Sequence, residues 1–88
     1  MKVIFTKTFK RDLKKLRNVP VWKQIGRTIV CVEQADKLLD VSSIKHIQGH
    51  EGFFRIRIGN YRLGMQVEDD VVIFMRALHR KEIYRRFP

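Results

Sequence analysis

The chain has 88 residues, a net charge of +10 and a hydrophobic content of 44%. This length predicts a single domain spanning residues 1–88. The sequence has no apolar run of ~18 residues and no signal-peptide pattern, so we expect a cytoplasmic protein without membrane contact. The only cysteine, Cys31, excludes an internal disulfide, and its apolar neighbours predict that it is buried.

The positive charge is concentrated at the two ends of the chain. Residues 1–27 carry nine Lys or Arg against one acid, whereas residues 28–52 carry two bases against four acids. Residues 53–88 carry eight bases against four acids. Folding could merge the two basic ends into one patch, which favours an anionic partner.

The first part of the chain predicts a short strand and two helices. Residues 2–6 (KVIFT) are β-branched and aromatic, which is typical of a strand. Apolar residues then recur at helical spacing among basic ones in residues 6–18, and Thr6 or Thr8 could cap this helix. A second helix is predicted to begin at Asn18-Val19-Pro20, because proline is tolerated in a first helical turn. The residues expected on the apolar face of this helix are Trp22, Ile25, Ile29, Val32 and Leu39.

The rest of the chain predicts a β-meander. Residues 40–52 are polar and contain two glycines, which indicates a loop. Residues 53–58 and 61–67 flank Gly59-Asn60, a pair typical of a two-residue hairpin turn. Residues 71–78 are apolar on both faces, as expected for a strand inside a sheet. The predicted fold is α+β, in the order β-α-α-β-β-β, with the helical pair packed on a mostly antiparallel sheet.

A turn at Gly59-Asn60 also fixes the register of the hairpin. The apolar side chains then pair on one face, and a slip of one residue would scramble them. These pairs are Ile58 with Tyr61, Ile56 with Leu63 and Phe54 with Met65. The opposite face carries Arg55, Arg57 and Arg62, with Arg57 directly facing Arg62 and open space over Gly64.

The three arginines have no acidic neighbour on the hairpin. Like charges that face each other destabilise a sheet by roughly 0.2–1 kcal/mol. A solvated face would explain the arginines only weakly, because Lys, Thr or Glu would serve as well and mixed charges better. Arginine stays charged, and its planar fork suits the geometry of a phosphate. The pattern therefore favours a phosphate-binding face.

The carboxyl-terminal segment RALHRKEIYRRF follows the last strand and is expected to approach the arginine face. His79 could exchange a proton at neutral pH, or it could be a surface residue at a strand end. Tyr84 could stack on a base or donate a proton, or it could anchor the tail to the core. Glu82 could simply pair with Arg85 or Arg86.

No Walker loop, GxSxG or HExxH motif occurs, and His46 and His50 lack the spacing of a zinc site. We therefore expect no metal and no cofactor. Phosphate chemistry of this kind suits RNA, because its own 2′-hydroxyl can attack the adjacent phosphorus. The protein then supplies cations for the charged transition state and groups that accept and donate a proton.

Three segments resemble the RelE/ParE superfamily of type II toxins, nearer its RelE-like branch. They are FKRDLKKL (residues 9–16), IKHIQGHEGFFRIRIGNYRLGM (44–65) and HRKEIYRRF (79–87), and the resemblance extends over almost the whole chain. It implies a compact α+β fold of the microbial-ribonuclease type. It also implies an endoribonuclease that cuts mRNA in the ribosomal A site and leaves a cyclic phosphate.

The resemblance assigns roles to individual residues. Arg62 matches the arginine expected to stabilise the phosphorane, and His79 falls at a position where many members carry a histidine as acid or base. The full catalytic set that it implies is Arg55, Arg57, Arg62, His79, Arg80 and Tyr84. The residues expected to contact RNA of the ribosome are Lys10, Arg11, Lys14, Lys15, Arg17, Arg76 and Lys81.

The implied partner is a cognate acidic antitoxin, which would cover the basic surface in a toxin–antitoxin hetero-oligomer. Two departures from the family pattern are expected to matter. Gly64 and Met65 replace bulkier residues and could widen the face beside Arg55, and the chain is short, with no extra C-terminal helix. Two alternatives stay open: a ParE-like inhibitor of DNA gyrase, and an RNA-binding module without catalysis. The arginine face with Tyr84 favours the ribonuclease.

Overall fold

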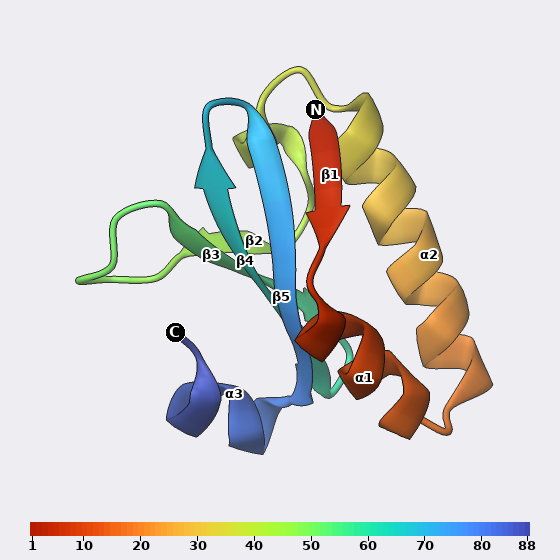
Figure 1. Ribbon diagram of the computed structural model, residues 1–88. Helices are drawn as coiled ribbons and strands as arrows, with labels where there is room; N and C mark the ends of the chain where they lie inside the picture. Colours follow the sequence, from red (N-terminus) through yellow and green to blue (C-terminus); the bar gives the residue numbers. More distant parts are fainter.

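The computed structural model shows a five-stranded sheet with helices on both faces (Figure 1). It describes residues 1–88, except for the side chain of Val19. The strands lie in the order β1-β5-β4-β3-β2, and all neighbours are antiparallel except the parallel pair β1 and β5. The elements are β1 (Lys2–Phe5), α1 (Lys7–Lys15), α2 (Val19–Gln34), the 3-10 helix η1 (Leu38–Asp40), β2 (Ile44–His46), β3 (Phe53–Ile58), β4 (Tyr61–Glu68), β5 (Val71–His79) and α3 (Arg80–Arg86).

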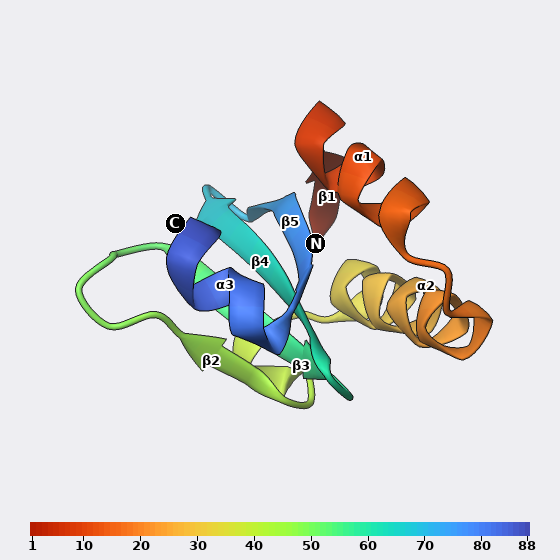
Figure 2. The same ribbon diagram turned by 90° about the horizontal axis from the view of Figure 1, so that it is seen from below.

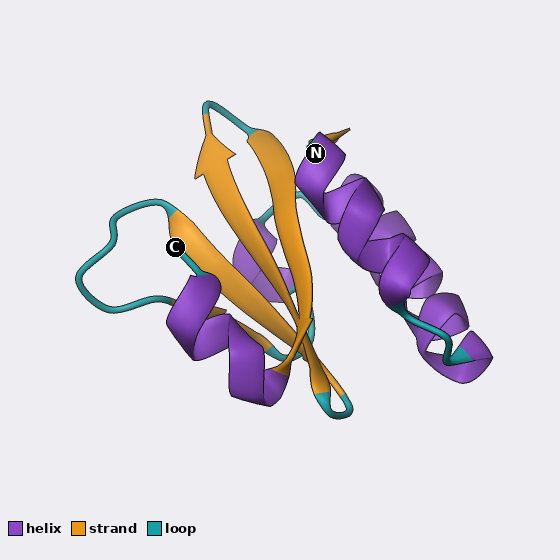
Figure 3. Ribbon diagram, turned by 60° about the horizontal axis from the view of Figure 1, so that its bottom comes forward, coloured by secondary structure: helices purple, strands orange, loops and turns teal.

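The helices form two separate layers. Helices α1 and α2 cover one face of the sheet, and α3 lies against the other (Figures 2 and 3). The predicted α+β class and the helical pair are therefore confirmed. Among the described helices, none combines the length and the apolar character needed to cross a bilayer.

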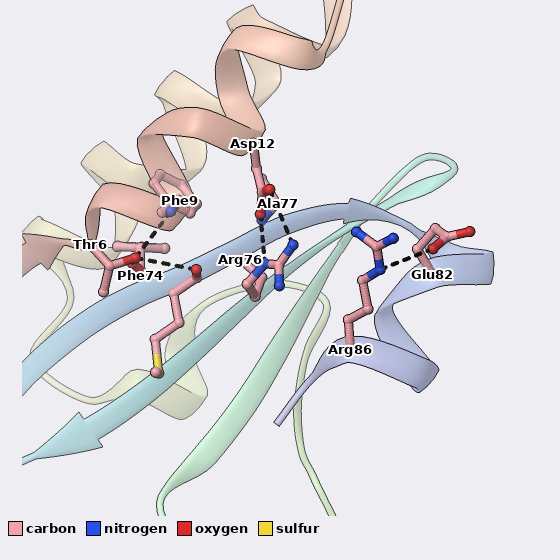
Figure 4. Close-up of polar contacts among 9 residues, drawn as sticks. Thr6, Phe9, Asp12, Phe74, Arg76, Ala77, Glu82 and Arg86 are labelled. Carbon is pink, nitrogen blue, oxygen red and sulfur yellow. Dashed lines mark hydrogen bonds and ion pairs between the residues drawn. The ribbon is translucent and has the colours of Figure 1, made fainter.

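The main core lies between the sheet and the helical pair. Phe9 and Phe74 are fully buried there, with ring centroids 5.4 Å apart. Thr6 starts α1: its hydroxyl accepts a hydrogen bond from Phe9 N (3.0 Å) and donates to the Phe74 carbonyl (3.3 Å), so it ties α1 to β5 (Figure 4). This confirms Thr6 as the cap of the first helix.

The predicted hairpin register is confirmed at every position. Ile58 pairs with Tyr61, and Arg57 pairs with Arg62. Strand β5 lies inside the sheet between β1 and β4, as its two-sided apolar pattern predicted.

Helix α3 corrects the expectation that no further C-terminal helix exists. The segment is seven residues long and mostly charged, so its periodicity is weak. It is held by Ile83 and Phe87, which are 2% and 8% exposed. The expected open space over Gly64 is also corrected, because the Phe87 ring fills it: a Cβ on Gly64 would lie 2.7 Å from Phe87 Cδ2.

Three expectations for residues 22–52 were wrong. Helix α2 ends at Gln34, so Leu39 lies beyond it and is 75% exposed, while its neighbour Leu38 is buried. Trp22 and Cys31 are exposed, because successive helical positions point about 100° apart and the inward direction is taken by their chain neighbours Val21 and Val32. The expected loop contains strand β2, three residues long and visible only through its pairing with β3.

Candidate functional site

A cleft of about 320 Å³ lies on the α3 side of the sheet. Strands β3 and β4 supply its arginines, and α3 supplies Tyr84. The residues that line it are Ser43, Lys45, Arg55, Arg57, Arg62 and Tyr84. The three hairpin arginines expected to share one face therefore converge on one cleft.

The cleft is positively charged and contains no acidic side chain. The ion pairs that the described residues form join Asp12 to Arg76 and Glu82 to Arg85 and Arg86, so they leave the cleft arginines uncompensated. The predicted pairing of Glu82 within α3 is thereby confirmed.

The surroundings of Arg62 disfavour the charged form of its guanidinium. Burial lowers the pKa of its guanidinium, Tyr84 opposes that shift, and the charges of Arg57, Arg55 and Arg80 lower the pKa further. The protein therefore holds a charge at Arg62 that its own surroundings disfavour. An anion bound in the cleft would relieve this repulsion.

Two contacts orient the cleft cations before any ligand binds. Arg62 Nη1 donates to the carbonyl oxygens of Gly59 and Tyr61, both at 2.8 Å, which leaves the other nitrogens of the guanidinium for a ligand. Arg55 Cζ lies 5.0 Å from the centroid of the Tyr84 ring, in a cation–π contact. Tyr84 itself is 66% exposed, so its ring is accessible from solvent while it holds Arg55.

The sequence analysis missed Ser43 and Lys45. Lys45 is the register partner of Arg55 across β2 and β3, which places it on the same face as the arginines. The alternation of Ile44, Lys45 and His46 was the available signal, but three residues are too few to distinguish a strand from a polar loop.

His79 does not line the cleft. Its register partner is Tyr61, on the core side of the hairpin, and the two rings meet edge to face at 5.6 Å. Its Nδ1 accepts a hydrogen bond from Lys81 N at 3.2 Å, so His79 caps α3. Of the two interpretations offered for His79, this position supports the residue at a strand end.

Arg80 lies close enough to Arg62 to affect its pKa, and its backbone N–H donates to the Asn60 carbonyl at 2.8 Å. The side chain of Arg80 is exposed at the first turn of α3. Arg80 therefore lies close to the cleft, although neither Arg80 nor His79 is among the residues that line it.

Arg76 has a structural partner instead of being free for RNA. Asp12, only 4% exposed, accepts from Arg76 Nε at 2.8 Å, from Arg76 Nη2 at 3.2 Å and from Ala77 N at 3.0 Å (Figure 4). An irregularity in the register of β4 and β5, which leaves Met75 out of the pairing, coincides with this contact. Arg76 therefore joins β5 to α1, and its expected contact with ribosomal RNA stays a prediction.

The other basic residues expected to contact RNA are exposed on two sides of the molecule. Lys81 lies on α3, the helix that supplies Tyr84 to the cleft. Helix α1 lies on the opposite face of the sheet from α3 (Figure 2). The exposed bases on or just after α1 are Lys10, Arg11, Lys14, Lys15 and Arg17. Among the described residues, no three His, Cys, Asp or Glu side chains gather into a group that could hold a metal ion.

The fold agrees with the comparison to known families. Residues 3–84 match the family described as the ParE toxin of type II toxin–antitoxin systems. The chain therefore belongs to the RelE/ParE superfamily of type II toxins, and within it to the RelE family. It is 46% identical over 91 residues to Toxin RelE3 of Methanocaldococcus jannaschii, with all of both chains covered.

Solved structures show the same fold. The toxin of the RelB–RelE antitoxin–toxin complex from Methanococcus jannaschii superimposes with a TM-score of 0.83 and 41% identity, over 97% of this chain and 99% of that one. The RelE–RelB complex from Pyrococcus horikoshii OT3 gives a TM-score of 0.73 at 18% identity, over 90% and 93% of the two chains. The intact Escherichia coli RelBE complex gives 0.71 at 21%, over 89% and 94%.

Proposed function

We propose that this toxin is an endoribonuclease that cuts mRNA in the ribosomal A site, without a metal ion, in the cytoplasm. The observation that carries the proposal is the convergence of Arg55, Arg57 and Arg62 on one cleft that no carboxylate neutralises. Such an arrangement lowers the stability of the free protein and is useful only when an anion is bound. The RNA backbone supplies that anion.

The proposed reaction uses the RNA itself as nucleophile. The 2′-oxygen attacks the adjacent phosphorus while its proton passes to water, and the bond from phosphorus to the 5′-oxygen breaks. The products are a 2′,3′-cyclic phosphate and a 5′-hydroxyl, so atoms and charge balance. Arg62, held by its two carbonyl contacts, faces the extra charge of the phosphorane. Tyr84 donates the proton that the 5′-oxygen takes up, and regains one from water.

Primer extension on a translated message tests this proposal. We expect discrete cuts within codons for the wild type, no cuts for Arg62→Ala and slower cuts for Tyr84→Phe. The phenylalanine keeps the ring over Arg55 but lacks the hydroxyl, so affinity for RNA should be retained while the rate falls. Lys37→Ala removes an exposed base outside the cleft and should cut like the wild type.

The second candidate is a ParE-like inhibitor of DNA gyrase, because the description of the matched family names the ParE toxin. In that case the wild type would stop growth with messages intact and DNA supercoiling altered. A protein that binds RNA but neither cuts it nor stops growth would instead be a binding module. Either result would refute the nuclease.

We further propose that an acidic antitoxin covers the toxin and docks in an apolar hollow between α1 and α2. This hollow, of about 340 Å³, is lined by Leu13, Lys14, Trp22, Ile25, Gly26 and Ile29. Its apolar floor suits the apolar face of a helix, and the bases of α1 beside it suit acidic side chains on that helix. The solved relatives are described as complexes with antitoxins.

The single tryptophan of the chain reports on this docking. Trp22 is 48% exposed, so its emission should shift to the blue when the acidic protein encoded beside the toxin gene is added. Lys14→Glu should weaken this complex, and Lys37→Glu, with the same change of charge away from the hollow, should not. An unchanged emission on binding would place the antitoxin elsewhere.

A further inference from the structure

The cleft continues into two further hollows. A hollow of about 420 Å³ shares Ser43 and Arg57 with the cleft. A second one of about 350 Å³ shares Gln24 and Arg27 with the first and ends at Lys23 on α2. The three depressions are therefore neighbours, and together they mark a path from the hairpin arginines to the first half of α2.

The path passes around a free edge of the sheet. Strand β2 begins at Ile44, which pairs with Ile56, so the last two residues of β3 pair with β4 but have no strand on the β2 side. At this point Arg57 N donates to the Ser43 carbonyl at 3.2 Å. Ser43 has a φ of 63°, a left-handed conformation that is unfavourable for serine, and it borders both hollows. The backbone thus turns sharply where the path crosses from the α3 side to the α2 side.

The whole path carries one sign of charge. Its lining residues include no acid, and its bases are Lys23, Arg27, Lys45, Arg55, Arg57 and Arg62. None of these bases takes part in the ion pairs formed by the described residues. Lys23 and Arg27 also stand four residues apart on α2, where like charges destabilise a helix. The uncompensated repulsion seen in the cleft is therefore repeated at the far end of the path.

We propose that the part of this path from Arg57 and Ser43 to Arg27 and Lys23, the exit track, holds the backbone of the RNA strand on one side of the scissile phosphate. The proposal rests on the proposed function, which places that phosphate in the cleft. Positive side chains and neutral polar groups suit a phosphodiester chain, whereas the apolar hollow between α1 and α2 suits a protein helix. Lys23 and Arg27 are one helical turn, about 6 Å, apart and can hold successive phosphates.

The test compares RNA length and salt dependence. The ligands are 2′-O-methyl RNA of three and of ten nucleotides, which cannot be cut. The proteins are the wild type, K23A/R27A and the matched control K2A/K37A, which loses the same charge at exposed positions outside the path. Thermal unfolding of each variant verifies that it is folded.

The exit track predicts a difference only for the long RNA. Each phosphate contact contributes about 0.7 to the slope of log affinity against log salt for a single strand, so K23A/R27A should lose about 1.4 of that slope. Between 50 and 200 mM salt the wild type should therefore lose about sevenfold more affinity than K23A/R27A. For the trinucleotide, the wild type and K23A/R27A should have the same affinity and the same salt slope. K2A/K37A should have the salt slope of the wild type on both RNAs.

The outcomes separate this proposal from the nuclease. If the wild type cuts messages but K23A/R27A keeps the full salt slope on the long RNA, the exit track is refuted. If the slope falls as expected and the wild type cuts nothing, Lys23 and Arg27 bind RNA, but the nuclease proposal fails and with it the place of the exit track beside a scissile phosphate. If K23A/R27A keeps the salt slope of the wild type for RNA but no longer binds the antitoxin, Lys23 and Arg27 contact the antitoxin and the exit track is refuted.

Discussion

Arg57 and Arg62 are cross-strand partners in the β3–β4 hairpin, and both line the cleft without a carboxylate among its residues. Their repulsion predicts a conflict between stability and function. Arg57→Gln should raise the free energy of unfolding by roughly 0.2–1 kcal/mol, because it removes one of two opposed charges. The same change should weaken binding of RNA. Urea denaturation and RNA titration measure the two effects.

Two controls test whether charge repulsion causes the gain in stability of Arg57→Gln: a measurement at high salt and the same substitution at another arginine. The gain in stability should shrink in 1 M salt, where the screening length falls to about 3 Å. Arg17→Gln, at an exposed site beyond α1, should change stability little. A less stable Arg57→Gln protein would mean that Arg57 is held by attractive contacts and that the repulsion is not felt.

The hairpin and its arginine face could be predicted from the sequence because their information is local. Gly59-Asn60 sets the turn, and alternation then dictates which side chains share a face. The same reasoning predicted the cap at Thr6 and the start of α2 near Asn18. Each of these features depends on residues within a few positions of each other.

The rest of the site depends on contacts between distant parts of the chain. Strand β2 exists because β3 offers an edge to it, and Lys45 enters the cleft only through that pairing. Helix α3 is held over the sheet by Phe87 on Gly64. Arg76 looked free in the sequence because Asp12, its partner, is 64 residues away. Neither composition nor periodicity carries such information.

The contact between Gly64 and Phe87 predicts that a single methyl group disturbs the cleft. Gly64→Ala places Cβ 2.7 Å from the Phe87 ring, so the ring and α3 must shift, at an expected loss of about 1–3 kcal/mol. Since Tyr84 lies on α3, its contact with Arg55 should loosen and RNA cutting should slow. Chemical denaturation and primer extension measure these effects.

A double-mutant cycle tests whether the contact with Phe87 causes the loss of stability in Gly64→Ala. Phe87→Leu should destabilise the wild type more than it destabilises Gly64→Ala, because the smaller side chain makes room for the methyl group. Gly26→Ala is the contrasting change: nothing lies within 4 Å of the added Cβ on α2, and we expect a gain of about 0.8–1 kcal/mol. Additive effects of Gly64→Ala and Phe87→Leu would contradict the packing argument.

The buried pair of Asp12 and Arg76 predicts a large loss of stability on a change remote from the cleft. Asp12→Asn leaves Arg76, whose side chain is 20% exposed, without its charge partner, at an expected loss of about 3 kcal/mol. Glu82→Gln removes two exposed pairs and should cost under about 1 kcal/mol. A small loss for Asp12→Asn would show that Arg76 finds another partner and would reopen its role in RNA binding.

The cap formed by His79 predicts that its side chain stabilises α3 and does not take part in the chemistry. His79→Ala removes the acceptor for Lys81 N and should lower the free energy of unfolding by about 1 kcal/mol. His79→Asn offers a good capping oxygen but cannot act as an acid or base near neutral pH, so it should restore stability. Its rate of RNA cutting should match the wild type across pH 5 to 8, the range in which an ordinary histidine titrates. A fully stable His79→Asn protein that cuts slowly would instead assign His79 to the proton transfer.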